Sequence, residues 1–153
     1  MQKIDFDRHF QWGKKIATGS RGPVYRAVCT QAYTTKLGKQ LRAGDEVAVK
    51  VFLLERMTTT QRAQLQSEFQ VLQSVGHIDT CEELLDGFQT TDDLILVKTL
   101  CHLAPLAQAI LSAGATSSIT ETIMADYMKD PFATVFALHE RSIVHAGISV
   151  SDA

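Results

Sequence analysis

The amino-acid sequence predicts an α+β domain in which a mainly antiparallel sheet with one helix precedes a helical part. Strand-like runs separated by glycine-containing turns occupy residues 11–52. A single long run with helical periodicity follows at residues 58–75. Two further strand-like runs precede residue 102, and only helical patterns come after it. The chain therefore divides into a sheet-containing part and a helical part, with residues 1–9 as a short polar lead.

Three strands are expected before the first helix. Two of them flank a glycine turn between Gln11 and Cys29, and the second contains the strand-forming run 24–28. The polar residues 30–44 include glycines and predict a long hairpin connection. In the third strand, 46–52, successive side chains point to opposite faces. Val47, Val49 and Val51 share one face, and Ala48, Lys50 and Phe52 share the other.

The clearest helix runs from Thr58 to Val75. The threonines at 58–60 are candidate N-caps, and Gly76 supplies a C-terminal stop. Leu65, Phe69 and Leu72 repeat at helical spacing, so they form an apolar stripe.

Strands at 82–89 and 94–97 are expected after this helix. The second is a continuous apolar run, which predicts a strand buried on both faces. Helices are then expected at 104–113 and 120–140. Pro131 lies inside the last of these and should kink or split it.

Composition limits the class of function. The chain has 153 residues, 45% of them hydrophobic, and a formal net charge of −2. This charge balance argues against a nucleic-acid binder, which would carry a basic patch. No apolar run approaches the roughly 18 residues of a membrane span. The charged N-terminus lacks the apolar core of a secretory signal.

The three cysteines have no CxxC spacing. We expect reduced thiols in an intracellular, cytoplasmic protein, and no metal site.

Three features can carry chemistry, and each has a simpler explanation. Gly19 and Gly22 let a turn point backbone N–H groups at a phosphate, but a plain hairpin turn also uses glycines. Lys50 lies beside Ala48 on one strand face, where a buried ammonium needs a partner; a solvated lysine on an edge strand is the alternative. Glu68 lies near the apolar stripe of the helix, where it can meet Lys50 or remain an exposed charge.

Taken in order, these signals resemble the protein kinases, in which a glycine-rich loop, a strand lysine and a helix glutamate follow one another. The segments that carry the resemblance are 16–24, 47–50 and Glu68, which precedes His77 by nine residues. The segment 138–145 looks like the entry to the kinase catalytic loop. The resemblance covers roughly residues 10–152 and looks more like a serine/threonine than a tyrosine kinase.

The resemblance implies a small lobe at 10–101, with a five-stranded antiparallel sheet plus one helix. It implies the first helices of the large lobe at 102–153, ending at a degenerate catalytic loop. It also implies a nucleotide cleft, in which Lys50 contacts phosphate and Glu68 is its ion-pair partner. The other implied nucleotide-binding residues are Ile16, Ala17, Thr18, Gly19, Ser20, Arg21, Gly22, Val24 and Ala48.

Two residues of this cleft depart from the kinase pattern. Ala17 stands where the family has the first glycine of its loop. Lys98 stands at the gatekeeper position, at the back of the adenine site. Its stem can pack there while its charge seeks a phosphate or a carboxylate, or it can obstruct the site.

The catalytic loop departs further. After His145, Gly147 stands in place of the aspartate that accepts the substrate's proton, and Ser149 in place of a lysine. Asp152 stands in place of the asparagine that binds magnesium, and no DFG segment follows within the sequence. The resemblance therefore implies ATP as cofactor, leaves magnesium doubtful, and provides no intact catalytic residue.

We expect a kinase-fold protein with a nucleotide cleft but without intact phosphotransfer machinery: a pseudokinase or truncated kinase that acts through protein contacts. The alternative is a fragment of an active protein serine/threonine kinase. A Rossmann-type dinucleotide enzyme is disfavoured, because its glycines open a helix and 24–28 is strand-like. Apolar residues of the last helix are expected to be exposed and to favour self-association or a protein partner, namely Phe132, Val135, Phe136 and Leu138.

Overall fold

The computed structural model describes residues 3–19, 22–101, 108, 110–112 and 120–145. The chain divides into two compact units. Residues 1–76 with 82–101 form the first, called the small lobe below, and residues 77–81 with 102–153 form the second, called the helical unit. The predicted helix at 104–113 lies mostly outside the described residues, of which 108 and 110–112 are helical.

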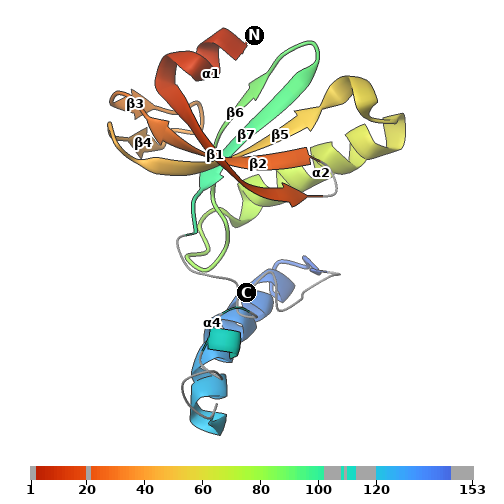
Figure 1. Ribbon diagram of the computed structural model, residues 1–153. Helices are drawn as coiled ribbons and strands as arrows, with labels where there is room; N and C mark the ends of the chain where they lie inside the picture. The colour runs from red at the N-terminus through yellow and green to blue at the C-terminus, as the bar shows by residue number, and fades with distance from the viewer. Residues whose placement is uncertain (1–2, 20–21, 102–107, 109, 113–119, 146–153) are drawn as a thin grey trace. The chain divides into compact units, whose positions relative to one another are not determined.

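A five-stranded antiparallel sheet forms the small lobe (Figure 1). Its spatial order is β1-β2-β5-β7-β6. The strands are β1 Phe10–Gly19, β2 Gly22–Cys29, β5 Glu46–Leu53, β6 Leu84–Gln89 and β7 Asp93–Thr99. The sheet and its single long helix confirm the predicted α+β class.

Strand β7 is the predicted fully buried strand. Ile95, Leu96 and Val97 are each no more than 1% exposed. Ile95 and Val97 pack in the core on one face of the sheet, and Leu96 packs in the core on the other. A continuous apolar run is therefore what this position between β5 and β6 requires.

Helix α2 (Thr59–Val75) covers one face of the sheet, called the inner face below. It begins with a capping box in which Thr58 and Gln61 each accept a backbone N–H of the other. Leu65, with Phe69 and Leu72 beside it, packs against apolar side chains of β5, β6 and β7. The helix ends at Gly76, as the sequence predicts.

The opposite, outer face is covered by the N-terminal residues. The segment predicted as a polar lead forms helix α1 (Lys3–His9), so that expectation is incomplete. Phe6 is fully buried, and its ring stacks on Phe10 at a centroid distance of 4.9 Å. Phe6 thus anchors α1 to the outer core, although the segment looks polar in sequence.

The connection 30–44 contains a short hairpin that also packs on the outer face. Its strands are β3 Tyr33–Thr34 and β4 Gln40–Leu41. The Tyr33 hydroxyl donates to Oδ2 of the buried Asp86 at 2.5 Å, and Lys36 Nζ donates to the carbonyl of Gly87 at 3.0 Å. The hairpin thereby covers β6, an edge strand of the sheet, and limits its access to other chains.

Helix α4 (Glu121–His139) is the main element of the helical unit. It continues through Pro131 without interruption, so of the two outcomes expected there, a kink or a split, the split is wrong. Proline removes one backbone donor, and the other hydrogen bonds of a helix of 19 residues hold the element together. No helix in the described part of the chain is both long and apolar enough to cross a membrane.

Exposure along α4 agrees with the sequence at two positions of four. Phe132 and Phe136 are each 66% exposed, as predicted. Val135 is half-buried and Leu138 is buried, so the prediction of an exposed Leu138 is wrong. Leu138 lies two residues from Phe136, about 200° around the helix, and therefore on the opposite side.

Candidate functional site

Strand β5 sets the framework of the candidate site. Its alternation places Ala48, Lys50 and Phe52 on the inner face, as the sequence predicts, because Phe52 packs in the core beneath α2 while Val47 and Val49 pack in the outer core. Lys50 is paired across the sheet with Val24 of β2 and Leu96 of β7. A basic side chain thus stands on an inner face that is otherwise mostly apolar.

Lys50 finds a partner in Glu68. Its Nζ lies 3.3 Å from Glu68 Oε1, and the two side chains are 18% and 28% exposed. The same ammonium lies 4.9 Å from the centroid of the Phe52 ring, within reach of a cation–π contact. The burial of Leu65 holds α2 against the sheet, and Glu68 lies one turn further along, close to β5. Of the two interpretations open from sequence, the paired lysine is the observed one.

The glycine turn joins β1 and β2, and its last pair in register is Gly19 with Gly22. Gly22 has φ +145°, and a Cβ built on it would lie 2.1 Å from the carbonyl oxygen of Val51. Glycine is therefore required here for the close approach of the turn to β5. Ser20 and Arg21 lie outside the described residues.

The expected adenine wall consists of Ile16 on β1, Val24 on β2 and Ala48 on β5. Ile16 is 49% exposed, Val24 is half-buried and Ala48 is buried. Ala17 and Thr18 are exposed along the end of β1. An exposed isoleucine beside a half-buried valine offers apolar surface that a planar base can cover.

Lys98 on β7 is the direct cross-strand neighbour of Ala48. It is only 7% exposed, and its Nζ donates to Glu82 Oε2 at 2.6 Å. Its charge therefore meets a carboxylate, which is one of the outcomes open from sequence. The sequence did not identify Glu82 as the partner of Lys98. The strand register explains the contact, since Leu84, two residues after Glu82, pairs with Lys98.

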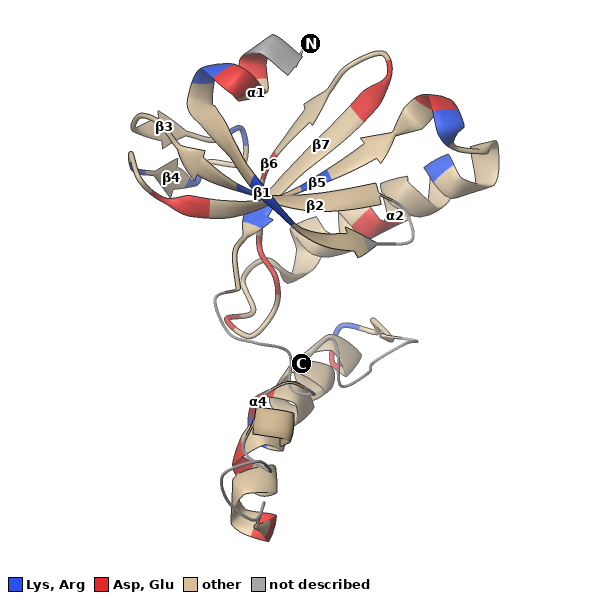
Figure 2. Ribbon diagram, viewed as in Figure 1, with Lys and Arg blue, Asp and Glu red and all other residues tan. Residues whose placement is uncertain are grey.

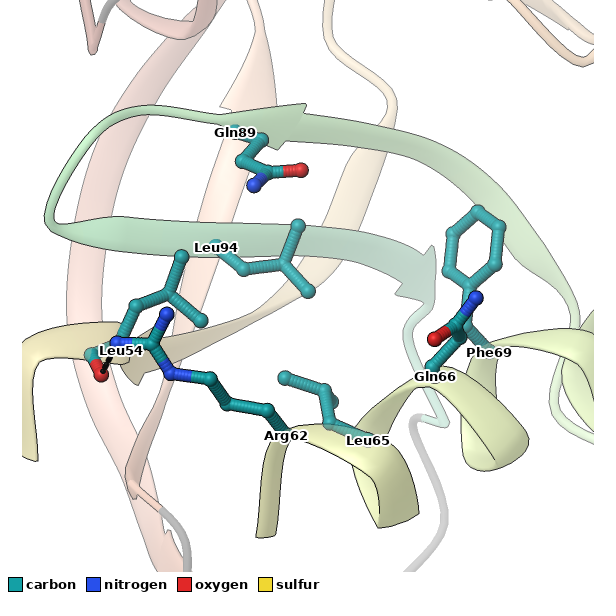
Figure 3. A pocket seen from close by; sticks show the side chains of 7 residues that line it. All are labelled: Leu54, Arg62, Leu65, Gln66, Phe69, Gln89 and Leu94. Atoms are coloured by element: carbon teal, nitrogen blue, oxygen red, sulfur yellow. Dashed lines mark hydrogen bonds between the residues drawn. The ribbon is translucent and has the colours of Figure 1, made fainter. Parts of the chain in front are cut away.

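A separate pocket lies along residues 62–69 of α2, with a volume of about 340 Å³. Figure 3 shows Arg62, Leu65, Gln66 and Phe69 of α2 facing Leu54, Gln89 and Leu94. Two of these lining residues are joined by a hydrogen bond, in which Arg62 donates to the carbonyl of Leu54 at 2.6 Å. Neither Lys50 nor Glu68 lines this pocket, so it is distinct from the expected nucleotide site.

The remaining charges give little support to other sites. Figure 2 shows acidic and basic residues interspersed over the small lobe. Among the described residues, no group of three or more His, Cys, Asp or Glu side chains is placed to hold a metal ion. His145 is exposed, and Gly147 and Asp152 lie outside the described residues.

A family model for the protein kinase domain matches residues 10–149. The chain belongs to the protein kinase family. The match begins at β1 and extends beyond α4, so it includes the inner face of the sheet with Lys50 and Glu68. The five-stranded sheet and α2 match a kinase small lobe, and α4 matches the start of the large lobe.

Individual relatives agree with this family. Calcium/calmodulin-dependent serine/threonine-protein kinase 1 of Oryza sativa subsp. japonica is 25% identical over 145 residues, covering 92% of this chain and 22% of the relative. Cell division control protein 7 of Schizosaccharomyces pombe is 24% identical over 136 residues, covering 89% of this chain and 11% of the relative. This kinase chain therefore spans less than a quarter of either protein.

A solved structure gives the same fold. The twitchin kinase fragment of C. elegans, described as an autoregulated protein kinase with immunoglobulin domains, superposes with a TM-score of 0.72 at 17% identity. The superposition covers 98% of this chain and 29% of the twitchin chain. At this identity the likeness establishes the kinase fold and no more.

Proposed function

We propose that this kinase-fold protein binds a purine nucleotide, ATP by family resemblance, against the inner face of its small lobe and does not itself transfer phosphate. The Lys50–Glu68 ion pair carries the proposal, because it fixes an ammonium on the inner face of the sheet. The glycine turn between β1 and β2 belongs to the same sheet, so phosphates bound there can reach this ammonium. Ile16, Val24 and Ala48 supply the apolar surface for the base.

The absence of transfer rests on the residues after His145. Phosphoryl transfer depends on positioned charge and on a residue that orients or deprotonates the attacking hydroxyl. Gly147 has no side chain for that role. Asp152 is a carboxylate that can still ligate magnesium, so the missing side chain at Gly147 carries this half of the proposal.

Thermal shift and calorimetry with ATP, each with and without magnesium, test the binding half. We expect Lys50→Met to weaken ATP binding by about tenfold, because it removes a charge-assisted contact to phosphate. Lys14→Met, which removes an exposed lysine of β1, is the matched control. A chain that shows no shift at millimolar ATP contradicts the proposal.

A fragment of an active protein serine/threonine kinase is the second candidate. The chain matches only 22% and 11% of the lengths of its two kinase relatives. Sequencing the transcript beyond Ala153 and assaying the longest product with labelled ATP decides between the two. Incorporation of phosphate into a protein substrate, lost in Lys50→Met, would favour the active kinase.

We further propose that α4 contacts a second copy of the chain. Lys129, Phe132, Phe136 and Glu140 are all exposed and lie on one stripe at helical spacing. An antiparallel two-fold pairing centred near Thr134 sets Phe132 against Phe136 of the second copy and Lys129 against its Glu140. The stripe is thus complementary to itself in apolar character and in charge.

Light scattering on charge-swapped variants tests this pairing. Lys129→Glu or Glu140→Lys alone should weaken a dimer, and the double variant should restore it. A monodisperse monomer at high concentration contradicts the proposal, as does a dimer that neither single variant weakens.

We also propose a cytoplasmic location. Cys29 and Cys81 are free thiols, as proteins of a reducing compartment have. Localisation of the tagged chain by microscopy tests this.

A further inference from the structure

Lys98, beside the expected base site, is held by the carboxylate of Glu82, and the side of the strand on which they meet bears on what the site can bind. Lys98 and Ala48 are opposite each other on neighbouring strands and share the inner face of the sheet. Whatever binds against Ala48 therefore meets the side chain of Lys98. A buried ammonium there has donors and no acceptor, so its placement decides what the site accepts.

Glu82 draws the ammonium away from Ala48. Strand β7 lies between β5, which carries Ala48, and β6. Glu82 precedes β6 by two residues, and Leu84 of β6 pairs with Lys98. Because the Lys98 Nζ lies 2.6 Å from Glu82 Oε2, it is held on the β6 side of its strand. The methylene stem of Lys98, and not its charge, then adjoins Ala48.

We propose that Glu82 is a positioning residue that keeps the Lys98 ammonium out of the base site and so makes the site compatible with adenine. This inference rests on the proposed nucleotide binding. The exocyclic amine of adenine is a donor, whereas the corresponding oxygen of guanine or hypoxanthine is an acceptor. With Glu82 in place, the wall beside the base is aliphatic. Without it, the released ammonium opposes adenine and favours a 6-oxo purine.

The next residue provides a matched control. Glu83 forms an ion pair with Lys39 of the hairpin that packs on the outer face. Glu82 and Glu83 are therefore adjacent acids that each pair with a lysine, but on different sides of the sheet. A general effect of losing one acid and one ion pair would appear in both variants.

Calorimetric titration with ATP, GTP and ITP tests the proposal. Glu82→Gln should weaken ATP binding and raise the GTP/ATP and ITP/ATP affinity ratios by about tenfold, the size of one charge-assisted hydrogen bond. Glu83→Gln should leave these ratios at their wild-type values. In a Lys98→Met background, Glu82→Gln should no longer change them, because no ammonium remains to be released.

The outcomes separate this inference from the proposed function. A wild-type chain that binds none of the three nucleotides overturns both. A wild-type chain that binds ATP, with unchanged ratios in Glu82→Gln, overturns the role of Glu82 alone. Equal changes in Glu82→Gln and Glu83→Gln, or a full effect of Glu82→Gln in the Lys98→Met background, also overturn it. Fluorescence of Trp12 monitors folding of each variant, since it is the sole tryptophan and packs against Phe6 and Tyr25.

Discussion

The small lobe and the helical unit differ in how far their phenylalanine side chains are exposed to solvent. In the small lobe, Phe6, Phe10, Phe52 and Phe88 are each no more than 2% exposed, and they lie in two cores on opposite faces of one sheet. In the helical unit, Phe132 and Phe136 of α4 are each 66% exposed. The small lobe therefore completes its own cores, whereas α4 presents apolar surface that a contact can bury.

The largest expected difference comes from one substitution made in both regions. Phe6→Ala should destabilise the small lobe by about 3 kcal/mol, because it leaves a cavity in the outer core. At concentrations where the chain is monomeric, Phe136→Ala should change stability by less than about 0.5 kcal/mol, because its ring is mostly in water. Urea unfolding followed by Trp12 fluorescence and circular dichroism measures both. Equal effects would mean that the two regions do not differ as described.

A second comparison concerns backbone fit within the small lobe. Gly22→Ala should cost about 3 kcal/mol, because the new Cβ would meet the Val51 carbonyl at 2.1 Å and φ is +145°. Gly44→Ala is the control, with a positive φ of +93° but no atom within 4 Å of its Cβ, and should cost about 1 kcal/mol. If the two variants unfold at the same urea concentration, the close approach of the turn to β5 is not a constraint.

A third prediction concerns the buried polar contact under the hairpin. Tyr33→Phe removes the donor to Asp86 and should cost about 1–3 kcal/mol, because a fully buried carboxylate loses a partner. Burial, and then the hydrogen bond to Asp86, raise the pKa of Tyr33 above its ordinary value. The unfolded chain therefore releases this proton first, and stability should fall as the pH rises above about 10.

Denaturation at several alkaline pH values checks this dependence. The wild-type loss of stability should be smaller in Tyr33→Phe, which has no phenol to titrate at this position. Tyr127→Phe, which changes an exposed tyrosine of α4, should keep the wild-type slope. An unchanged slope in Tyr33→Phe would assign the alkaline effect to other groups.

The smallest expected difference lies at the two helix starts. Thr58→Ala should cost about 1 kcal/mol, because it breaks a reciprocal capping box at α2. Thr120→Ala removes a single contact, from the Ile123 N–H at 3.3 Å, and should cost about 0.5 kcal/mol. Thermal unfolding of both variants by circular dichroism makes the comparison. A larger loss at Thr120 would reverse the order of stability inferred for the two helices.

Local pattern predicted most of the small lobe. Alternation in β5 assigned Lys50 to the inner face, and helical spacing with a threonine cap and a glycine stop placed α2. Helix α1 was missed because two buried phenylalanines in a polar segment give no periodic signal. Of the kink or split expected at Pro131, the split is excluded, because local preference is weaker than the hydrogen bonds of the whole helix.

By itself, the sequence determined the order of the elements, the kinase resemblance and the loss of a side chain at Gly147, since these depend on residue type and spacing along the chain. The sequence offered Glu68 as one possible partner for Lys50 and named none for Lys98, and only the tertiary structure decided which charges meet. Lys50 and Glu68 are 18 residues apart, and Lys98 and Glu82 are 16 apart. Those pairs form because strand register and helix packing bring together residues that are far apart in the chain. The spacing of residues along the sequence does not give their separation in space.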